Sequence, residues 1–490
     1  MTTTCTLRDR LQNILAAQRA AHIEAAPVTA ETRIDRLDRL IRLTCENAIS
    51  IVDAIVADFG GARSRHFTTT SELLGKVQGM EHARHHVRQW MEPEPRETVG
   101  PVRAAGGACN VVRQPKGVVG IIAPWNMPFG LTVAPLTSAF AAGNRAMLKP
   151  SERAPATSEL LERLVTRYFA PEELAVVTGG WEVGEAFAQL PLDHLVFTGS
   201  SGIGRRIMEL ASANLVPVTL ELGGKSPVIV GETADLSRAA SLLVYGKMLN
   251  GGQLCLAPDY ALVPHRRRAE LIEHLARETK SMFPPKRHNP DHTGIISATH
   301  FARLRGYLDD AFSRGAEVVV VNPASDGVDP ADGLRMPLHV VLGATEEMAL
   351  MQQEIFGPIL PILTYETITE AVAIVRRGEK PLALYYFGQD ETEEGFVLAN
   401  TESGGVSVNQ LFQHYVQEDL PFGGVGHSGM GAYHGRDGFL ELSHSRAVYR
   451  QPALTPLPDI LRPPLTPQAL QTMHGGLSAR VSSRHVTEGR

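Results

Sequence analysis

Cys255 is the side chain in this sequence with the best setting for nucleophilic chemistry. It ends the stretch 250–255 (NGGQLC), where glycines let backbone approach closely and leave the amide beside the sulfur available as a donor. A thiolate in this setting could add to an electrophilic carbon. Most lone cysteines are small buried apolar side chains, so the stretch by itself leaves both interpretations open.

Two further polar residues have settings that suit a reaction at Cys255. Glu221 follows the apolar run Val216–Leu220, and a carboxyl withdrawn from water has a raised pKa, which suits a general base. The alternative, a salt-bridged surface glutamate, is disfavoured by that apolar run. Asn126 could donate an uncharged hydrogen bond to a developing oxyanion. An asparagine between prolines, as at 124–128, is also common in turns.

Two glycine-rich stretches compete as phosphate-binding loops. In 196–204 (VFTGSSGIG) an apolar strand runs into glycines and then into a helical pattern, so backbone amides at the helix N-terminus could hold a pyrophosphate. A plain strand-to-helix turn is an equally good interpretation. The stretch 424–429 (GVGHSG) formally matches G-x-G-x-x-G, but it follows no apolar strand and starts no helical pattern. We interpret it as a loop.

Length and composition limit the class of protein. A chain of 490 residues exceeds what one core usually serves, so two or more lobes are expected. The formal charge of −6 argues against general nucleic-acid binding and favours a small-molecule partner. Four widely spaced cysteines suggest neither a disulfide framework nor a zinc site, which is typical of the reduced cytoplasm. The charged N-terminal segment and the lack of long apolar runs predict neither a secretory signal nor a membrane span.

The apolar pattern predicts helices first and then two α/β lobes. Helical spacing is present at 7–15 and again at 34–41. From Val118 short β-branched runs alternate with helical stretches, which predicts a parallel sheet wrapped by helices. A second alternation starts at Ser226, and its clearest later strand is Glu317–Val321. The strands expected in the first lobe are 118–122, 174–177, 195–197 and 216–220, with a helix at 155–168.

Short motifs between Pro124 and Gly424 resemble the signatures of the aldehyde dehydrogenase superfamily, in that family's order. They are PWNMP (124–128), KPSE (149–152), the stretch 197–204, ELGGK (221–225), GQLC (252–255), EIFGP (354–358) and PFGG (421–424). The stretches CLAPDY (255–260), PLALY (381–385) and GHSGMG (426–431) are most similar to the branch with class 3, fatty-aldehyde and coniferyl aldehyde dehydrogenases. Met127 and Leu254 depart mildly from the pattern, which we expect to reshape the substrate tunnel and not the chemistry.

The resemblance implies a role for each motif residue. Cys255 would form the thiohemiacetal and thioester, Glu221 would activate the hydrolytic water, and Asn126 would stabilise the oxyanion. A hydrolytic enzyme is implied, because CoA-acylating members typically lack this glutamate. A carboxylate near the adenosine ribose favours NAD, with NADP possible. The implied cofactor-binding residues are Trp125, Lys149, Ser151, Glu152, Gly199, Ser200, Gly204, Glu354 and Phe356, and no metal is implied.

The resemblance also implies the domain organisation. A Rossmann-like NAD-binding domain is expected at 1–95 and 116–222, and a second α/β catalytic domain at 223–432, whose end could pack back on the first. A small β oligomerisation arm is expected at 96–115 and 433–450, followed by a proline-rich tail at 451–490. Members of this branch commonly form dimers and sometimes tetramers, so a homodimer is expected.

The leading hypothesis is NAD-dependent oxidation of an aromatic aldehyde, such as coniferyl aldehyde, or a medium-chain aldehyde to the acid. The alternatives are a cysteine esterase or amidase that needs no cofactor, and a catalytically silent relative. The silent relative is disfavoured because all the reacting side chains are present. The histidines at 82, 85 and 86 are expected to be solvated, because no carboxylate set accompanies them. Those at 427, 434 and 444 are expected in a C-terminal strap.

Overall fold

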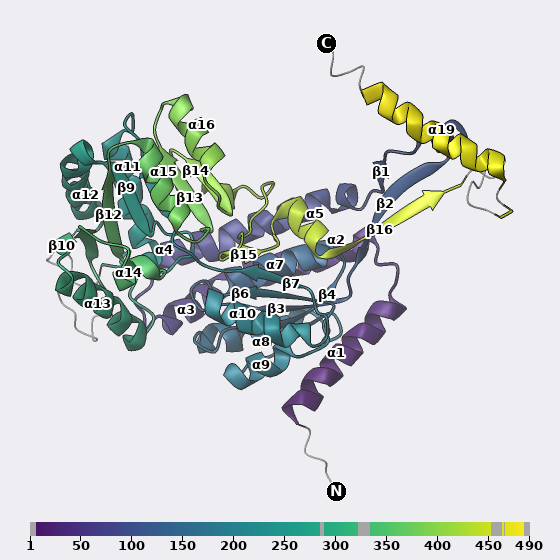
Figure 1. The fold of residues 1–490 in the computed structure, drawn as a ribbon. Helices are drawn as coiled ribbons and strands as arrows, with labels where there is room; N and C mark the ends of the chain where they lie inside the picture. The colour runs from purple at the N-terminus through teal and green to yellow at the C-terminus, as the bar shows by residue number, and fades with distance from the viewer. Residues whose placement is uncertain (1–5, 285–288, 322–333, 452–462, 465, 485–490) are drawn as a thin grey trace, which may run out of the picture. The chain divides into compact units, whose positions relative to one another are not determined.

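The computed structural model describes residues 6–284, 289–321, 334–451, 463–464 and 466–484. This part of the chain falls into two compact units. The larger unit comprises the chain up to Met91 and residues 113–444, and it contains two helix-covered sheets (Figure 1). The smaller unit comprises residues 92–112 and the chain from Ser445.

The first sheet of the larger unit has the strand order β15-β7-β6-β3-β4-β5. Strands β3 to β7 are parallel, and only β15 runs antiparallel to its neighbour. The strands are β3 (Val118–Ile122), β4 (Arg145–Lys149), β5 (Leu174–Val176), β6 (His194–Thr198), β7 (Val218–Glu221) and β15 (Gly429–Met430). The central residues of these strands are mostly apolar and buried, because helices cover both faces of the sheet.

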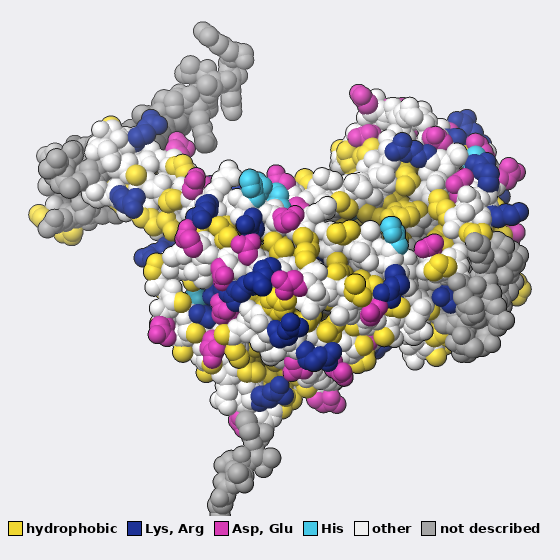
Figure 2. Space-filling view, turned by 180° about the vertical axis from the view of Figure 1, so that it is seen from behind, with side chains coloured by type: hydrophobic (Ala, Val, Ile, Leu, Met, Phe, Trp, Pro, Cys, Tyr) yellow, Lys and Arg dark blue, Asp and Glu magenta, His cyan; other side chains and the backbone are white. Residues whose placement is uncertain are grey.

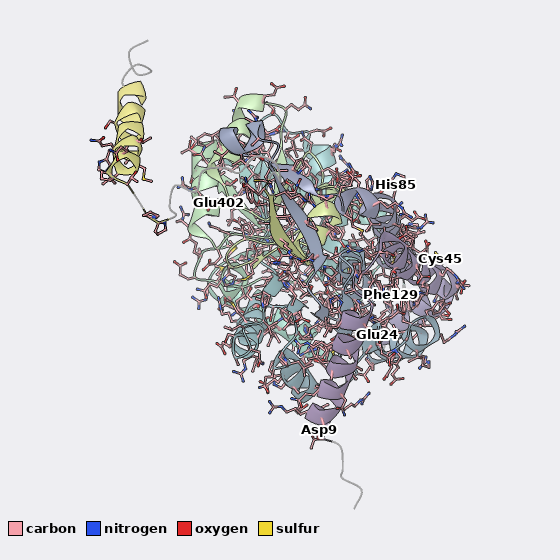
Figure 3. All side chains as sticks on the ribbon, turned by 90° about the vertical axis from the view of Figure 1, so that its right-hand side faces the viewer. Asp9, Glu24, Cys45, His85, Phe129 and Glu402 are labelled. Carbon is pink, nitrogen blue, oxygen red and sulfur yellow. The ribbon has the colours of Figure 1, made fainter. Side chains whose placement is uncertain are left out.

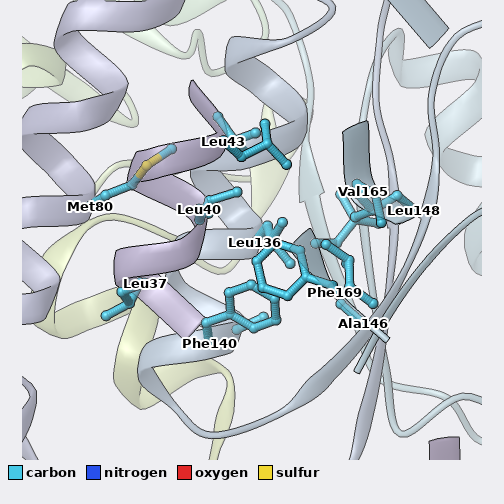
Figure 4. Close-up of a cluster of buried hydrophobic side chains, with 14 of the residues drawn as sticks. Leu37, Leu40, Leu43, Met80, Leu136, Phe140, Ala146, Leu148, Val165 and Phe169 are labelled. Carbon is cyan, nitrogen blue, oxygen red and sulfur yellow. The ribbon is translucent and has the colours of Figure 1, made fainter. Parts of the chain in front are cut away.

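Helices before and between these strands form the two layers. They are α1 (Leu7–Glu24), α2 (Ala30–Glu46), α3 (Ala48–Asp58), α4 (Arg65–Phe67), the π-helix η1 (Thr68–Leu74), α5 (Gly75–Trp90), α7 (Gly130–Ala141), α8 (Pro155–Tyr168), α9 (Trp181–Ala188), α10 (Ser201–Ser212) and α18 (Gly435–Glu441). Successive residues of a strand enter opposite cores: Val119 packs with Leu40 and Phe140, whereas Val118 packs with Leu11. Figure 4 shows the first of these cores, where the rings of Phe140 and Phe169 lie 5.4 Å apart.

The second sheet has the strand order β10-β11-β12-β9-β8-β13-β14. Only β10 is antiparallel to its neighbour. The strands are β8 (Pro227–Val230), β9 (Tyr260–Pro264), β10 (Glu317–Val321), β11 (Leu338–Leu342), β12 (Ile359–Tyr365), β13 (Ala383–Phe387) and β14 (Gly405–Val408). The accompanying helices are α11 (Leu236–Met248), the 3-10 turns η2 (Leu249–Gly252) and η3 (His265–Arg267), α12 (Arg268–Met282), α13 (Ala298–Ser313), α14 (Ala349–Gln352), α15 (Ile368–Arg377), α16 (Glu391–Asn400) and α17 (Gln413–Val416).

The smaller unit is built on a three-stranded sheet with the order β1-β2-β16. Strands β1 (Glu94–Arg96) and β2 (Ala108–Pro115) form an antiparallel hairpin in the region where the β arm was expected, with helix α6 (Gly100–Ala104) between them. Strand β16 (Ser443–Arg450) completes the sheet, and helix α19 (Pro467–Arg484) follows. The sequence analysis expected only a proline-rich tail there. It missed α19 because the prolines before residue 467 dominated the pattern.

Residues 433–442 differ from the boundary expected for the arm. Phe439 and Leu442 are buried in the core of the first sheet, together with Trp90 of α5. Only the following strand, β16, joins the small sheet. The segment was expected in the arm because no local pattern shows that these two apolar side chains complete a core formed by residues about 300 positions earlier.

The molecular surface is mixed in charge. On the face that Figure 2 shows, Lys and Arg side chains are interspersed with Asp and Glu. Across the described ranges, no helix is both long and apolar enough to span a membrane.

Candidate active site

The turn before Cys255 has a left-handed backbone. In η2 the φ angle is 52° at Asn250, 63° at Gly251 and 72° at Gly252. Such angles favour glycine and are tolerated by asparagine. The last position also lacks room for a side chain, because a Cβ on Gly252 would lie 2.5 Å from the carbonyl carbon and oxygen of Gly357. The turn therefore packs directly on the segment that carries the EIFGP motif.

The side chain of Gln253 anchors this turn. Its Nε2 donates to the carbonyl oxygens of Asn250 (2.8 Å) and Gly294 (3.0 Å), and its Oε1 accepts from the Ile296 amide (3.0 Å). Both amide hydrogens of this buried side chain are used, which fixes its orientation. Cys255 follows two residues later on a backbone with little freedom.

Asn126 lies beside the same turn. Its side-chain Nδ2 donates to the backbone carbonyl of Gln253 (3.0 Å). The backbone carbonyl of Asn126 accepts from the side chains of Arg63 (2.8 Å) and Asn250 (3.2 Å). Arg63 is held in turn by a fully buried ion pair with Glu72 (2.6 Å). The Asn126 amide nitrogen carries a second hydrogen, which can serve a substrate oxyanion.

Glu221 ends β7 with its carboxyl buried. The residue is 2% exposed, and neither carboxyl oxygen has a hydrogen-bond partner among the residues that the structure describes. Burial raises the pKa of Glu221 well above its usual value, and the charge of Glu441 raises it further. A carboxyl in this state can exchange a proton near neutral pH. The carboxyl of Glu221 is therefore withdrawn from water, as the apolar run Val216–Leu220 predicted.

The thiol of Cys255 is strongly shifted toward its protonated form. Burial raises its pKa to about 12, and the charges of Glu354 and Glu221 contribute to the same shift. Backbone amides of Cys255 and Leu256 oppose this shift by hydrogen bonding to the sulfur. The thiol is therefore protonated at neutral pH and must lose its proton as it attacks. Cys45, by contrast, lies exposed on α2 (Figure 3).

Glu354 presents a buried, unused acceptor to the site. Burial and the charge of Asp259 raise the pKa of Glu354 to about 8, against the opposing effect of a hydrogen bond from the Gly224 amide. Within the described residues its Oε1 has no partner. Glycine at 223 makes room for this carboxyl, since a Cβ there would lie 2.1 Å from Glu354 Oε2. A ribose hydroxyl would satisfy the free oxygen.

Three aromatic rings meet near Glu354. The Trp125 ring lies edge to face against Phe356 (5.6 Å, 78°) and against His300 (5.0 Å, 67°). Phe356 has a φ of 51°, which is rare for a bulky side chain and marks a strained position. Such strain persists only where surrounding contacts fix the backbone, and it is common at functional sites.

Lys149 and Glu152 form an ion pair at the end of β4. Lys149 Nζ donates to Glu152 Oε2 at 2.8 Å; the lysine side chain is buried and the glutamate is half exposed. Burial is the largest single influence and acts to raise the pKa of Glu152, but the hydrogen bonds to this carboxyl and the charges of Lys149 and Arg153 together outweigh it and the net pKa is lowered. Glu152 is therefore ionised at neutral pH. Ser151 lies between the two, and its carbonyl accepts from Ser158 Oγ (2.9 Å).

The loop 199–204 leads into the N-terminus of α10. Ser200 is the N-cap residue, and its carbonyl accepts from the Gly204 amide (2.9 Å). Close packing requires both glycines, because a Cβ on Gly199 would lie 2.5 Å from Phe197 and one on Gly204 would lie 2.7 Å from Leu222. The competing stretch 424–429 is a loop, as predicted, and ends where Gly429 pairs with Glu221.

One cleft of about 1220 Å³ connects these groups. It is lined by eleven of the twelve predicted site residues: Asn126, Glu221, Cys255, Trp125, Lys149, Ser151, Glu152, Gly199, Ser200, Glu354 and Phe356. Gly204 is the exception, because it packs behind the loop against Leu222. The lining fits a dinucleotide: a helix N-terminus suits the pyrophosphate, and Glu152 and Glu354 offer acceptors to two riboses.

Comparison with known proteins decides the family. The Aldehyde dehydrogenase family pattern matches residues 2–448. This chain belongs to the aldehyde dehydrogenase family. The dehydrogenase is 47% identical over 456 residues to a probable coniferyl aldehyde dehydrogenase of Caulobacter vibrioides, covering 93% of this chain and 94% of the relative. It is 44% identical over 475 residues to the coniferyl aldehyde dehydrogenase of a Pseudomonas species, covering 97% of each.

A solved structure supports the same assignment. The substrate-bound state of Staphylococcus aureus AldH superimposes on this dehydrogenase with a TM-score of 0.86 at 33% identity, covering 93% of this chain and 96% of that one. The predicted α/β fold class, the family and the branch are thereby confirmed. The dehydrogenase is an oxidoreductase that acts on aldehydes with NAD(P). A cofactor-free cysteine hydrolase is excluded as its family.

Four charged residues that the dehydrogenase holds beside the site were not predicted to have a role. They are Arg63, Lys225, Lys247 and Asp259. Lys225 and Asp259 stand inside the quoted motifs ELGGK and CLAPDY, so a signal existed. Arg63 and Lys247 gave no comparable signal, because burial of a charge depends on partners that are distant in sequence.

Two of the histidines expected in a C-terminal strap lie elsewhere. His434 is buried with its ring stacked 5.1 Å from Phe422, and His427 lines the cleft. The prediction failed because it treated the region after PFGG as one surface segment, whereas residues 421–442 return to the core of the larger unit.

The three histidines of α5 lie close to one another. The ring of His86 is 4.3 Å from that of His82 and 4.9 Å from that of His85. Over the ranges that the structure describes, no group of three or more His, Cys, Asp or Glu residues is arranged to hold a metal ion.

Substitution of Gly252 by alanine tests the turn. The added Cβ would meet the Gly357 carbonyl at 2.5 Å and would strain a φ of 72°. We expect kcat/KM to fall about 100-fold, because a displacement of roughly 1 Å at the thiol is sufficient for that loss. Gly306→Ala is the matched control, since Gly306 has open space around it on α13. Equal activities of the two variants would show that the turn does not position Cys255.

Proposed function

We propose that this dehydrogenase oxidises an aromatic aldehyde of the coniferyl type to the carboxylic acid with NAD. The observation that carries the proposal is the meeting of Cys255, Glu221 and Asn126 in one cleft, beside an aromatic cluster. The two bacterial relatives named for coniferyl aldehyde support this substrate class.

A buried aromatic cluster lies behind the thiol. Cys255 packs against a core that includes Tyr385, Phe412, Phe422 and Tyr433. The ring of Tyr385 lies edge to face with Phe412 (6.2 Å, 84°), and that of Phe422 lies edge to face with Tyr433 (5.6 Å, 84°). These four rings are buried and are not among the residues that line the cleft, so the aromatic substrate class rests on the two relatives named for coniferyl aldehyde.

Cys255 and Glu221 share the proton chemistry of the first half-reaction. The thiol loses its proton as the sulfur bonds to the aldehyde carbon, and Glu221, with its raised pKa, accepts that proton directly or through a water. Asn126 and the Cys255 amide donate to the oxyanion of the resulting thiohemiacetal. Glu354 and Phe356 would hold the nicotinamide, which would supply the hydride acceptor for oxidation of the thiohemiacetal to the thioester.

Glu221 also serves the hydrolytic half-reaction. Its two buried oxygens, unpartnered among the described residues, can accept a proton from a water that attacks the thioester. The acid then leaves, and the proton returns to Cys255 or to solvent. This glutamate is the reason we assign a hydrolytic and not a CoA-acylating reaction.

Glu152 favours NAD over NADP. It is ionised and held by Lys149 beside the cleft. Its oxygens can accept from ribose hydroxyls, and its charge would repel a 2′-phosphate. We assign binding of the nicotinamide ribose and ring to Trp125, Glu354 and Phe356. We assign binding of the pyrophosphate to the backbone amides at Ser200.

The two sheets are assigned to an NAD-binding domain (1–95 and 116–222) and a catalytic domain (223–432). The small sheet β1-β2-β16 is assigned to homodimer formation, with a tetramer as the larger alternative. The described cysteines Cys45, Cys109 and Cys255 are all free thiols, which fits the cytoplasm.

A substrate panel tests the proposal. Purified enzyme is mixed with NAD or NADP and with coniferyl aldehyde, benzaldehyde or hexanal, and the absorbance of reduced cofactor is followed. We expect the highest kcat/KM with coniferyl aldehyde, and a higher value with NAD than with NADP. Hexanal as the best substrate would contradict the aromatic assignment, and a preference for NADP would contradict the role of Glu152.

Glu221→Gln tests the base. Glutamine fills the same space but cannot accept the proton, so we expect steady-state turnover to fall by about 10²–10⁴. A rapid-mixing experiment distinguishes the two half-reactions: a burst of reduced cofactor followed by slow turnover assigns Glu221 to thioester hydrolysis, and loss of the burst assigns it also to the thiol. Glu185→Gln, a surface partner of Arg206, is the control. Turnover at the native rate in Glu221→Gln would remove the residue from the mechanism.

A further inference from the structure

Four charged side chains meet where the segments of the catalytic cleft converge. Asp259 and Lys247 are 2% and 0% exposed, Lys225 is 18% exposed at its side chain, and the carboxyl of Glu354 has a buried oxygen. Two cations and two carboxyls in such an environment have large effects on one another, because little water screens their charges.

Asp259 is the residue through which these segments are joined. Its Oδ2 accepts from Lys225 Nζ, and its Oδ1 accepts from the amide of Ile355 at 3.0 Å. Its own amide donates to the carbonyl of Ser226 at 2.8 Å. One residue thus binds the segment after Glu221 and the segment that carries Glu354, and it lies on the segment that carries the thiol.

The two lysines extend this connection. Lys225 Nζ also donates to the carbonyls of Leu350 (2.7 Å) and Gln353 (3.1 Å), just before Glu354. Lys247 Nζ lies 3.8 Å from Asp259 Oδ1 and has no hydrogen-bond partner in the described part of the chain. Lys247 is on α11, one residue before the end of the helix that leads into the left-handed turn. The segments that carry Glu221, Cys255 and Glu354 therefore meet at the carboxylate of Asp259.

We propose that Asp259 is a positioning residue that ties the segments carrying Glu221, Cys255 and Glu354 together, and that its charge, balanced by Lys225 and Lys247, sets the pH range of NAD binding. The second part rests on the proposed role of Glu354 at the nicotinamide ribose.

The sign of the pH effect follows from the groups around Glu354. Asp259 raises the pKa of Glu354, whereas Lys225, Arg303 and the Gly224 amide lower it. The buried ammonium of Lys247 and the thiol of Cys255 also interact with this carboxyl. Burial is the largest influence and brings the pKa of Glu354 to about 8. A ribose hydroxyl donates more strongly to a carboxylate than to a neutral acid, so NAD should bind more tightly above this pH.

Asp259→Asn separates the charge from the hydrogen bonds. Asparagine can still accept from the Ile355 amide through its carbonyl oxygen, but it carries no charge. We expect the pH midpoint of NAD binding, followed by quenching of tryptophan fluorescence, to move about one unit lower. We also expect kcat/KM for the aldehyde to fall about 100-fold as the segments lose their alignment.

Lys225→Gln provides the opposite test. Lys225 lowers the pKa of Glu354, so its loss should move the pH midpoint of NAD binding upward. The pKa of Lys247 should change in the same way: Asp259→Asn lowers it and Lys225→Gln raises it. Opposite shifts in two variants cannot arise from general loss of structure. Lys225→Gln also keeps the proposal testable if Asp259→Asn does not fold.

Asp193→Asn is the matched control. Asp193 likewise accepts from a backbone amide (Val118, 2.8 Å) and pairs with one cation (Arg19, 3.3 Å), but it lies on the first sheet. We expect its midpoint to equal that of the native enzyme. The proposal is overturned if Asp259→Asn and Lys225→Gln leave the midpoint unchanged, or shift it in the same direction. Because cofactor binding needs no turnover, this result is independent of the aldehyde that the enzyme oxidises.

Discussion

The withdrawal of one thiol from water is the constraint on which this site depends. Cys255 lies where burial and two carboxyls, Glu354 and Glu221, oppose its ionisation. The cost of forming a thiolate in the resting enzyme is therefore high, although Cys255 is only partly buried and lines the cleft that admits a substrate. Nucleophilic attack becomes coupled to proton transfer, which makes the neighbouring base part of the same chemical step.

The backbone around the thiol meets this constraint with unusual geometry. Three consecutive left-handed residues, Asn250 to Gly252, bring the chain against the Gly357 carbonyl, and Phe356, directly before Gly357, also adopts a positive φ. Both departures are maintained by buried polar contacts, those of Gln253 and Asp259. Strain of this kind is stable only where the surrounding contacts are complete, and both sheets contribute to them.

The sequence predicted those parts of the fold and site that depend on local patterns. Strand β3 and helix α8 were predicted with the observed boundaries, because apolar runs and helical spacing are properties of neighbouring residues. The environment of Glu221 was also predictable from the apolar run before it. Helix α19 and the return of Phe439 into the core were not, because the first followed a proline-rich stretch and the second depends on a partner surface far away in the sequence.

The charged residues beside the site illustrate the same limit. Asp259 and Lys225 lie in motifs that were recognised, yet their pairing could not be derived without the fold that brings residues 34 positions apart within bonding distance. Gly204 shows the converse: the motif suggested a phosphate contact, but the missing side chain makes room for Leu222. Motifs identified which residues matter, and packing determined what several of them do.

The pH dependence of Cys255 alkylation in the cofactor-free enzyme tests the central claim most directly. The enzyme is treated with iodoacetamide over a range of pH, and modification of the peptide that contains Cys255 is followed by mass spectrometry, which separates it from Cys45 and Cys109. A thiol withdrawn from water should react slowly at neutral pH, with a rate that still rises above about pH 10, beyond the ordinary cysteine pKa of about 8.5. A rate that reaches its plateau at or below about pH 8.5 would mean that the resting enzyme already holds a thiolate, and would contradict this account.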